Sequence, residues 1–230
     1  MKATTELTFE HRKVCVYDAA DNKNAPVIYS LDFKESGSSL LEKCEELGCK
    51  SFNLVTVSHL HWDAELSPWP ADKIISKFDN FTGDADTLLQ MLTKKIAPKI
   101  ETLMNWKPTT RILAGYSMSG LFALYSAFCT DCFSAIVSAS GSLWFPNIIE
   151  YVKNHAPSPS LRQAYFSIGD LESKTKHPFM KTTETNTQTI AQLLQAKGVE
   201  TYFELNPGNH FKEQVLREAK GICWAISKLS

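Results

Sequence analysis

The sequence predicts a three-layer α/β fold, with helices flanking a mostly parallel central sheet. Short apolar and β-branched runs alternate along the chain with amphipathic helical patterns, the order that is typical of parallel sheets. Several of these runs are continuously apolar, as expected of strands that are covered on both faces. The 230 residues are 43% hydrophobic and contain no repeat or linker-like tract, so we expect a single domain spanning residues 1–230.

Each element is predicted from its own pattern. The expected strands are Lys13–Tyr17, Pro26–Leu31, Phe52–Ser58, Arg111–Tyr116, Ala135–Ala139, Ala164–Ile168 and Thr201–Leu205. The expected helices are Leu40–Leu47, Asp84–Met104, Leu121–Phe128, Thr187–Lys197 and Phe211–Lys228. Pro98 predicts a kink or a break in the second helix, and Gly198 is a good stop for the fourth. Ligands of such folds bind at the carboxyl ends of the strands, so the residues that follow each strand are the candidates for function.

Charge and hydropathy argue against several functional classes. Lys+Arg is 24 and Asp+Glu is 25, with no basic block, which disfavours a nucleic-acid partner or a charged membrane surface. No stretch of about 18 apolar residues is present, so no membrane-spanning helix is expected. The N-terminus has no apolar segment typical of a secretory signal. We therefore expect a cytoplasmic protein whose six cysteines are reduced thiols.

A serine stands at a strand-turn-helix junction. The strand Arg111–Tyr116 runs into Ser117, and a helical segment follows directly. Such a nucleophile elbow lifts the hydroxyl above the sheet and needs small residues beside it, usually in the pattern Gly-x-Ser-x-Gly. Here Ser119 replaces the second glycine, and Gly120 follows one place later. The alternative is a polar turn before a buried helix.

A serine nucleophile needs a base and a carboxylate, which follow it in the order acid, then histidine, in this kind of fold. His210 lies in a turn-rich loop after the last strand and is the preferred base over His155 and His177. The acid is expected after the strand Ala164–Ile168, where both Asp170 and Glu172 stand. Either carboxylate can hold the imidazole, and spacing alone does not choose between them.

These residues resemble the esterase branch of the α/β-hydrolases, which includes siderophore, feruloyl and acetyl-xylan esterases, S-formylglutathione hydrolases and mycolyltransferases. The resemblance covers roughly residues 26–210. The segments that carry it are Pro26–Asp32, Leu66–Trp69, Phe81–Leu89, Gly115–Gly120 and Ser138–Trp144. It implies a three-layer α/β-hydrolase fold and a serine esterase that needs no metal or organic cofactor, acting on a small ester of carbohydrate or siderophore type.

The resemblance also implies roles for individual residues. Ser117 would be the nucleophile, His210 the base, and Glu172 the preferred acid. The oxyanion hole would use the backbone N–H groups of Met118 and Lys34. The residues implied or considered for substrate binding are Trp144, Trp69, Trp62 and His61. The oligomeric state is not predicted.

Three alternatives stay open. The motif His59-x-His61-x-Asp63 follows a strand and is close to a zinc-hydrolase motif, although Ala64 stands where that motif has a further histidine. Cys129-x-x-Cys132 together with Cys44 and Cys49 offers four thiols for a structural zinc site, in a spacing typical of no common zinc module. The scaffold could also be a binding protein without catalysis.

Overall fold

The computed structural model describes residues 3–33, 35–74 and 79–228 and contains one eight-stranded sheet. The strand order is β1-β2-β4-β3-β5-β6-β7-β8; the pairs β1-β2 and β2-β4 are antiparallel, and every other pair is parallel. The strands are β1 Thr5–Phe9, β2 Arg12–Tyr17, β3 Val27–Leu31, β4 Asn53–Ser58, β5 Arg111–Tyr116, β6 Ala135–Ala139, β7 Gln163–Gly169 and β8 Glu200–Asn206. The predicted α/β fold with a mostly parallel sheet is confirmed.

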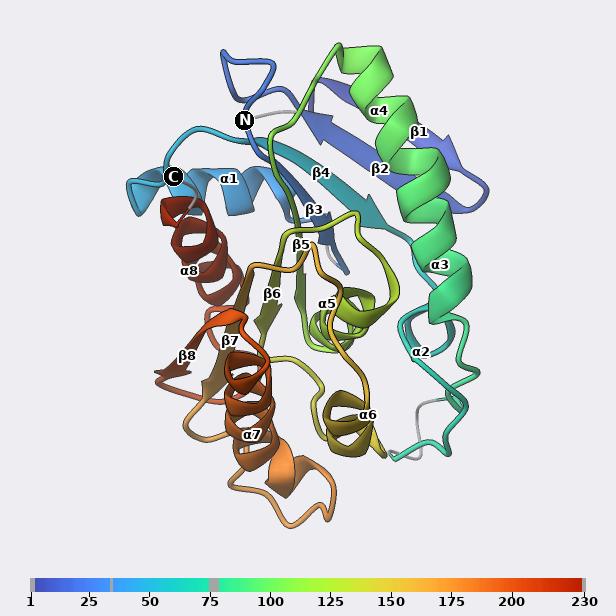
Figure 1. The fold of residues 1–230 in the computed structure, drawn as a ribbon, viewed down its shortest axis with the longest axis vertical. Helices are drawn as coiled ribbons and strands as arrows, with labels where there is room; N and C mark the ends of the chain where they lie inside the picture. Colours follow the sequence, from blue (N-terminus) through green and yellow to red (C-terminus); the bar gives the residue numbers. More distant parts are fainter. Residues whose placement is uncertain (1–2, 34, 75–78, 229–230) are drawn as a thin grey trace.

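Helices cover both faces of the sheet. They are α1 Gly37–Glu46, α2 Trp62–Glu65, α3 Ala85–Met91, α4 Ala97–Met104, α5 Met118–Cys129, α6 Ile148–Asn154, α7 Thr183–Ala196 and α8 Gln214–Ser227, with short turns of other helix types at Leu92–Ile96 and Met180–Thr182. Helices α1 and α8 lie side by side over one face, and α3 to α7 contribute to the core on the other (Figure 1).

The alternation of side chains along the central strands builds these two cores. In β4, Val55 and Val57 face the α3–α7 side, while Leu54 faces α1 and α8. In β7, Phe166 and Tyr165 divide between the faces in the same way. All of these residues are buried, which is why the parallel strands read as continuous apolar runs in the sequence.

Two elements differ from the sequence-based expectation. Strand β1 was not predicted, because its alternating pattern is short and half-exposed and its turn to β2 uses Glu10 at φ 59° rather than a glycine. The interruption expected around Pro98 is present as a π-helical turn over Leu92–Ile96. Pro98 then takes one of the first positions of α4, where a missing N–H costs little.

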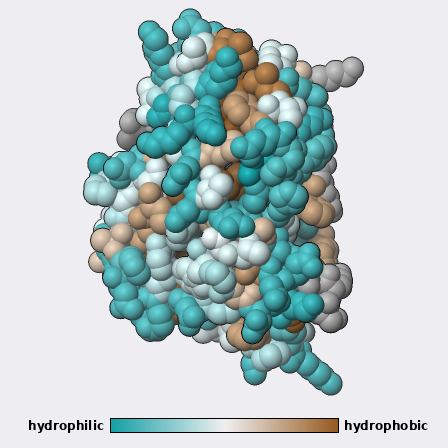
Figure 2. All heavy atoms as spheres, turned by 90° about the vertical axis from the view of Figure 1, so that its right-hand side faces the viewer, coloured by the Kyte–Doolittle hydropathy of each residue, from teal (hydrophilic) through white to brown (hydrophobic). Residues whose placement is uncertain are grey.

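The surface on the right-hand side of Figure 1 is largely hydrophilic, with separate smaller hydrophobic areas between the polar side chains (Figure 2). This pattern is typical of a solvent-exposed face. Within the part of the chain that the structure describes, no helix is both long and apolar enough to cross a membrane.

Candidate active site

Ser117 lies at the apex of the turn between β5 and α5, in a backbone conformation that is strained for a residue with a side chain. Its φ is 63° and its ψ is −122°. The turn is held by neighbouring strand ends: the Ser117 N–H donates to the carbonyl of Ala139 (3.1 Å), and the Ser117 carbonyl accepts from the N–H of Ser142 (2.9 Å). Strain of this kind persists only where the surrounding structure enforces it and clusters at functional sites.

The small residues around Ser117 are required by close contacts. A Cβ at Gly115 would lie 2.5 Å from the Ser119 carbonyl carbon, and a Cβ at Gly120 would lie 2.9 Å from Cα of Gly141. The Ser119 hydroxyl donates to the carbonyl of Tyr116 (2.7 Å) and accepts from its N–H (2.9 Å). Ser119 therefore closes the turn with its own side chain, which explains how the elbow tolerates serine where glycine is usual.

The loop after β8 brings His210 to Ser117. The Ser117 Oγ lies 3.1 Å from Nε2 of His210, within hydrogen-bond reach across 93 positions of sequence. The Tyr116 hydroxyl donates to the His210 carbonyl (2.7 Å), which ties this loop to the strand that carries the serine. Nucleophile and base candidates are thus in the geometry that proton transfer needs.

Glu172, and not Asp170, lies against the histidine. Nδ1 of His210 is 2.6 Å from Oε2 of Glu172. The other carboxylate, Asp170, accepts the N–H of Gly208 through Oδ1 (2.7 Å) and so shapes the loop that carries His210. The contact with His210 distinguishes Glu172 from Asp170, a distinction that spacing in the sequence alone did not make.

Arg217, which sequence reasoning missed, holds this arrangement from α8. Its side chain is 1% exposed and donates from Nη1 to Oε1 of Glu172 (2.7 Å) and to the Ser140 hydroxyl (3.0 Å). Its Nη2 donates to the carbonyls of Pro207 and Asn209, on either side of the turn before His210. The available signal was a charged residue on the apolar stripe of α8, one turn before Gly221.

Glu218, the next residue along α8, is also buried. The Ser30 hydroxyl donates to its Oε1 (2.7 Å). The pKa of Glu218 is raised from its usual 4.5 to about 7: burial raises it most, the hydrogen bond from Ser30 lowers it, and the nearby charge of Asp32 raises it. Ser30 lies in β3 and Asp32 directly follows it, so this carboxyl lies near the start of the loop that was expected to supply an oxyanion donor.

The structure describes only one of the two residues that were expected to donate backbone N–H groups to the oxyanion. Met118 is the first residue of α5, directly after Ser117, and the first N–H groups of a helix lack partners within the helix. Lys34 lies outside the described residues. The hydroxyl of Ser142, from the Ser138–Trp144 segment, approaches within 3.4 Å of the Ser117 Oγ and was not singled out from the sequence.

Two of the tryptophans expected to bind substrate are mostly packed into the protein. Trp144 is 9% exposed and lies beside Phe81, with ring centroids 6.2 Å apart. Trp69 packs against Phe145 and donates its indole N–H to the carbonyl of Pro146 (3.1 Å). Their expected contact with substrate stays a prediction.

The other two expected substrate residues lie nearer to solvent. Trp62 is half-buried at the start of α2 and meets the exposed ring of Phe33 edge-on, with centroids 5.1 Å apart. His61 is exposed, and its ring lies 4.3 Å from that of His11. Their contact with substrate is likewise a prediction.

The motif His59-x-His61-x-Asp63 does not gather its side chains around one point. His59 lies 2.8 Å from the carboxylate of Glu35, while His61 faces His11. Burial raises the pKa of Asp63. Across residues 3–33, 35–74 and 79–228, the clustered metal-ligating side chains do not include this motif. The geometry therefore does not support a zinc site at these three residues.

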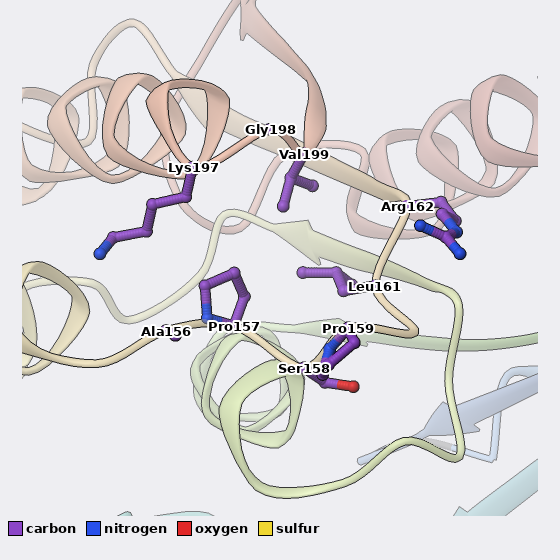
Figure 3. Close-up of a pocket in the computed structure, with 9 residues that line it drawn as sticks. All are labelled: Ala156, Pro157, Ser158, Pro159, Leu161, Arg162, Lys197, Gly198 and Val199. Atoms are coloured by element: carbon purple, nitrogen blue, oxygen red, sulfur yellow. The ribbon is translucent and has the colours of Figure 1, made fainter.

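A surface hollow of about 400 Å³ lies at the end of the sheet opposite to Ser117 (Figure 3). It is lined by residues that precede β7 and β8: Pro157, Leu161 and Val199 point toward its middle, with Lys197 and Arg162 at its sides. Because β5, β7 and β8 are parallel, this hollow is at their amino ends and Ser117 is at their carboxyl end. The hollow is therefore separate from the serine site.

Comparison with known proteins identifies a matching family and a curated relative. The family described as "Putative esterase" matches residues 6–215. A curated relative, "Uncharacterized protein YbbA" of Bacillus subtilis (strain 168), is 28% identical over 193 residues, which cover 78% of this chain and 75% of that protein.

Solved structures share the fold at low sequence identity. The siderophore hydrolase EstA from Aspergillus nidulans superposes with a TM-score of 0.76 at 17% identity, over 98% of this chain and 94% of that chain. The enterobactin esterase FES from Shigella flexneri, solved in the presence of enterobactin, superposes with a TM-score of 0.76 at 17% identity, over 100% of this chain and 60% of that chain. These likenesses confirm the expected esterase type of α/β-hydrolase fold.

Proposed function

The chain belongs to the "Putative esterase" family, and from this premise we propose that it is a serine esterase that hydrolyses small carboxylic esters through an acyl-enzyme intermediate. The observation that carries the proposal is the hydrogen-bonded series Ser117, His210 and Glu172, with distances of 3.1 and 2.6 Å. Nucleophile, base and orienting acid in mutual contact are the recognised requirement for serine hydrolysis.

The first half-reaction forms the acyl-enzyme. Nε2 of His210 accepts the proton of the Ser117 hydroxyl while Oγ attacks the ester carbonyl carbon. Glu172 accepts a hydrogen bond from the Nδ1–H of His210, which fixes the tautomer and stabilises the imidazolium that forms. The imidazolium then protonates the leaving alcohol, and water repeats the sequence to release the acid. In this proposal Arg217 holds Glu172 in place through its hydrogen bond to Oε1.

The developing oxyanion would be stabilised by backbone donors. The N–H of Met118 stands at the N-terminus of α5, where the helix dipole favours negative charge. The second donor would be Lys34, on the family resemblance alone. The hydroxyl of Ser142 is close enough to Ser117 to contact the same tetrahedral centre.

A siderophore-type ester is the substrate class that we favour. The two structural neighbours named above are a siderophore hydrolase and an enterobactin esterase, and the chain superposes on each over nearly its full length. Two exposed aromatic rings lie in loops that follow strand carboxyl ends: Phe33 after β3, packed against the half-buried Trp62, and Phe211 directly after His210. Flat accessible rings of this kind suit aryl groups of a substrate.

The test is serine-directed labelling together with ester turnover. We expect wild-type protein to react with a fluorophosphonate probe and to hydrolyse p-nitrophenyl acetate. Ser117→Ala should abolish labelling and lower kcat by about 10⁶-fold, since the whole constellation acts as one unit. Ser142→Ala is the matched comparison: its hydroxyl is 3.4 Å from Oγ of Ser117 but is not the one against His210, so this variant should still be labelled and should lose far less kcat than Ser117→Ala. Unlabelled wild-type protein would instead indicate a binding protein.

A further inference from the structure

Three cysteines converge at a place remote from the proposed chemistry. The sulfur atoms of Cys44, Cys49 and Cys223 all lie within 4.8 Å of one another. Two come from the end of α1 and the third comes from α8, and these two helices pack against each other over one face of the sheet (Figure 1). Among the residues that the structure describes, this is the one group of three or more His, Cys, Asp or Glu side chains whose ligand atoms gather in this way.

The end of α1 explains why the first two thiols meet. The N–H of Cys49 donates to the carbonyl of Cys44 (3.0 Å), and the N–H of Gly48 donates to the carbonyl of Glu45 (2.9 Å). Gly48 has a φ of +70°. These are the bonds of a Schellman motif, which brings the side chains at these two positions into contact. The contact is usually apolar, and here it pairs two thiols.

The third thiol reaches this pair across the helix interface. Ile222 and Ile226 of α8 are buried in the same core as Cys44, and Cys223 lies beside them at its edge. Its Sγ is 3.9 Å from the Cys44 carbonyl oxygen. Cys44 is 1% exposed, whereas Cys49 and Cys223 are half-buried. An ion can therefore reach the sulfurs from solvent while one side of the site stays closed by the core.

We propose that Cys44, Cys49 and Cys223 form a three-thiolate binding site for a soft d¹⁰ metal ion, Cu(I) or Zn²⁺. Three thiolates bound to one ion at about 2.3 Å stand about 4 Å apart, so the observed spacing needs only a small inward shift. Thiolate sulfur is the ligand that selects these ions over harder cations. Three thiolates saturate Cu(I), whereas Zn²⁺ would add a water as fourth ligand.

Binding involves no change of oxidation state. Each thiol releases its proton to solvent, and the sulfur lone pair that remains forms the bond to the metal. The bound ion would join the end of α1 to α8. It would stabilise the folded protein by an amount that grows with the logarithm of the free ion concentration, since the ligands are assembled only when both helices are folded.

The experiment titrates reduced, purified full-length protein with Cu(I) under nitrogen, and separately with Zn²⁺, each in competition with a chromophoric chelator of that ion. We expect one equivalent per chain to be withdrawn from the chelator in at least one arm, with a rise in Tm. Cys49→Ser and Cys223→Ser should each lose both effects. Cys129→Ser/Cys132→Ser, which removes two thiols elsewhere, is the matched control and should retain them.

Several outcomes would overturn the site. One is wild-type protein that withdraws neither ion from its chelator. Another is that Cys223→Ser withdraws the ion from its chelator, and gains in Tm, as much as wild type does. Circular dichroism shows whether each variant is folded, and the Tm shift of wild type alone keeps the test decisive if one variant is not. The ester hydrolysis proposed above uses none of these cysteines, so turnover by Cys223→Ser should match wild type whatever the metal result.

Discussion

Helices α5 and α8 pack on opposite faces of the same strands, β5 and β6, and they bury very different side chains. Helix α5 contains no charged residue and is buried along nearly its whole length. Helix α8 is amphipathic and buries two charged groups, Arg217 and Glu218. Both helices serve the same site, since α5 begins directly after Ser117 and Arg217 of α8 contacts Glu172.

The difference shows two ways of positioning a side chain of the proposed active site. The Ser117 conformation is enforced by close backbone packing, because α5 approaches the β6 loop so closely at Gly120 and Gly141 that a side chain would not fit. The orientation of His210 depends instead on charged hydrogen bonds that Arg217 makes to Glu172 and to the loop carbonyls. We therefore expect a position held by packing to be disturbed by substitutions that change side-chain shape. A position held by charged hydrogen bonds should be disturbed by substitutions that change the charge.

Among the residues whose contacts involve α8, the largest expected effect comes from removing the carboxylate of Glu172, which Arg217 contacts. Glu172→Gln keeps the shape of the side chain but can present an amide N–H₂ to Nδ1 of His210, which favours the wrong tautomer. We expect kcat for p-nitrophenyl acetate to fall by about 10⁴-fold, the size of effect known for triads that lose this charge. Circular dichroism should be recorded as well, since breaking a buried ion pair also lowers stability.

Asp170→Asn is the matched control for this change. Its side-chain oxygen can still accept the N–H of Gly208, so we expect the loop and kcat to stay close to wild type. An equal loss of kcat in both variants would show that the loop as a whole, rather than the contact between Glu172 and His210, supports activity.

The second prediction removes the cation. Arg217→Met leaves the Glu172 carboxylate buried without its partner, which should lower the free energy of unfolding by about 3–5 kcal/mol. We expect kcat to fall by about 10²-fold through misplacement of His210. KM should be unchanged, because Arg217 is buried beneath the proposed triad. Urea unfolding and steady-state kinetics measure the two effects separately.

Two further variants decide whether the loss of kcat in Arg217→Met comes from misplacement of His210 or from lower stability alone. Arg217→Lys keeps the charge without the planar fork, so kcat should lie between the wild-type and Arg217→Met values. Leu124→Ala, in the apolar α5, should lose about 2–5 kcal/mol of stability and leave kcat of the folded protein unchanged. If Leu124→Ala lowers kcat as much as Arg217→Met does, the distinction between the two helices fails.

The same contrast explains what the sequence could predict. The hydrophobic pattern of the sequence located the seven strands from β2 to β8. Position at strand ends and the chain order Ser, acid, His pointed to Ser117 and His210, which the structure brings within 3.1 Å of each other. These signals are local in sequence. The choice of Glu172 over Asp170 depends on which carboxylate points at His210 and which at Gly208, and that depends on a loop 38 residues away.

Partners that meet only through packing left weaker signals. Arg217 is 45 positions from Glu172, and Cys223 is 179 positions from Cys44. The sequence left a site of Cys44 and Cys49 with Cys129 and Cys132 as an open alternative, in a spacing typical of no common zinc module. Helix α8 instead supplies the third thiol, because its register against α1 is set by the core residues Ile222 and Ile226. The sequence marks such residues only as polar or sulfur-containing groups on an apolar stripe.

The smallest expected effect tests the second buried charge of α8. Burial raises the pKa of Glu218 from 4.5 to about 7, so between these pH values the folded protein holds a proton that the unfolded chain has lost. Stability should therefore fall as pH rises from 4.5 to 7, by about 3 kcal/mol in total, and stay at the lower value above pH 7.

Glu218→Gln should remove this dependence, since its carbonyl can still accept from the Ser30 hydroxyl and it has no proton to lose. Urea unfolding at pH 5 and pH 8 measures the effect: the variant should be more stable than wild type at pH 8, and the advantage should shrink at pH 5. The exposed Glu150→Gln on α6 should shift neither value by more than about 0.5 kcal/mol. Parallel pH profiles for wild type and Glu218→Gln would mean that Arg217 is the only buried group of α8 whose charge matters, and that the carboxyl beside Ser30 is already ionised in the folded protein at pH 5.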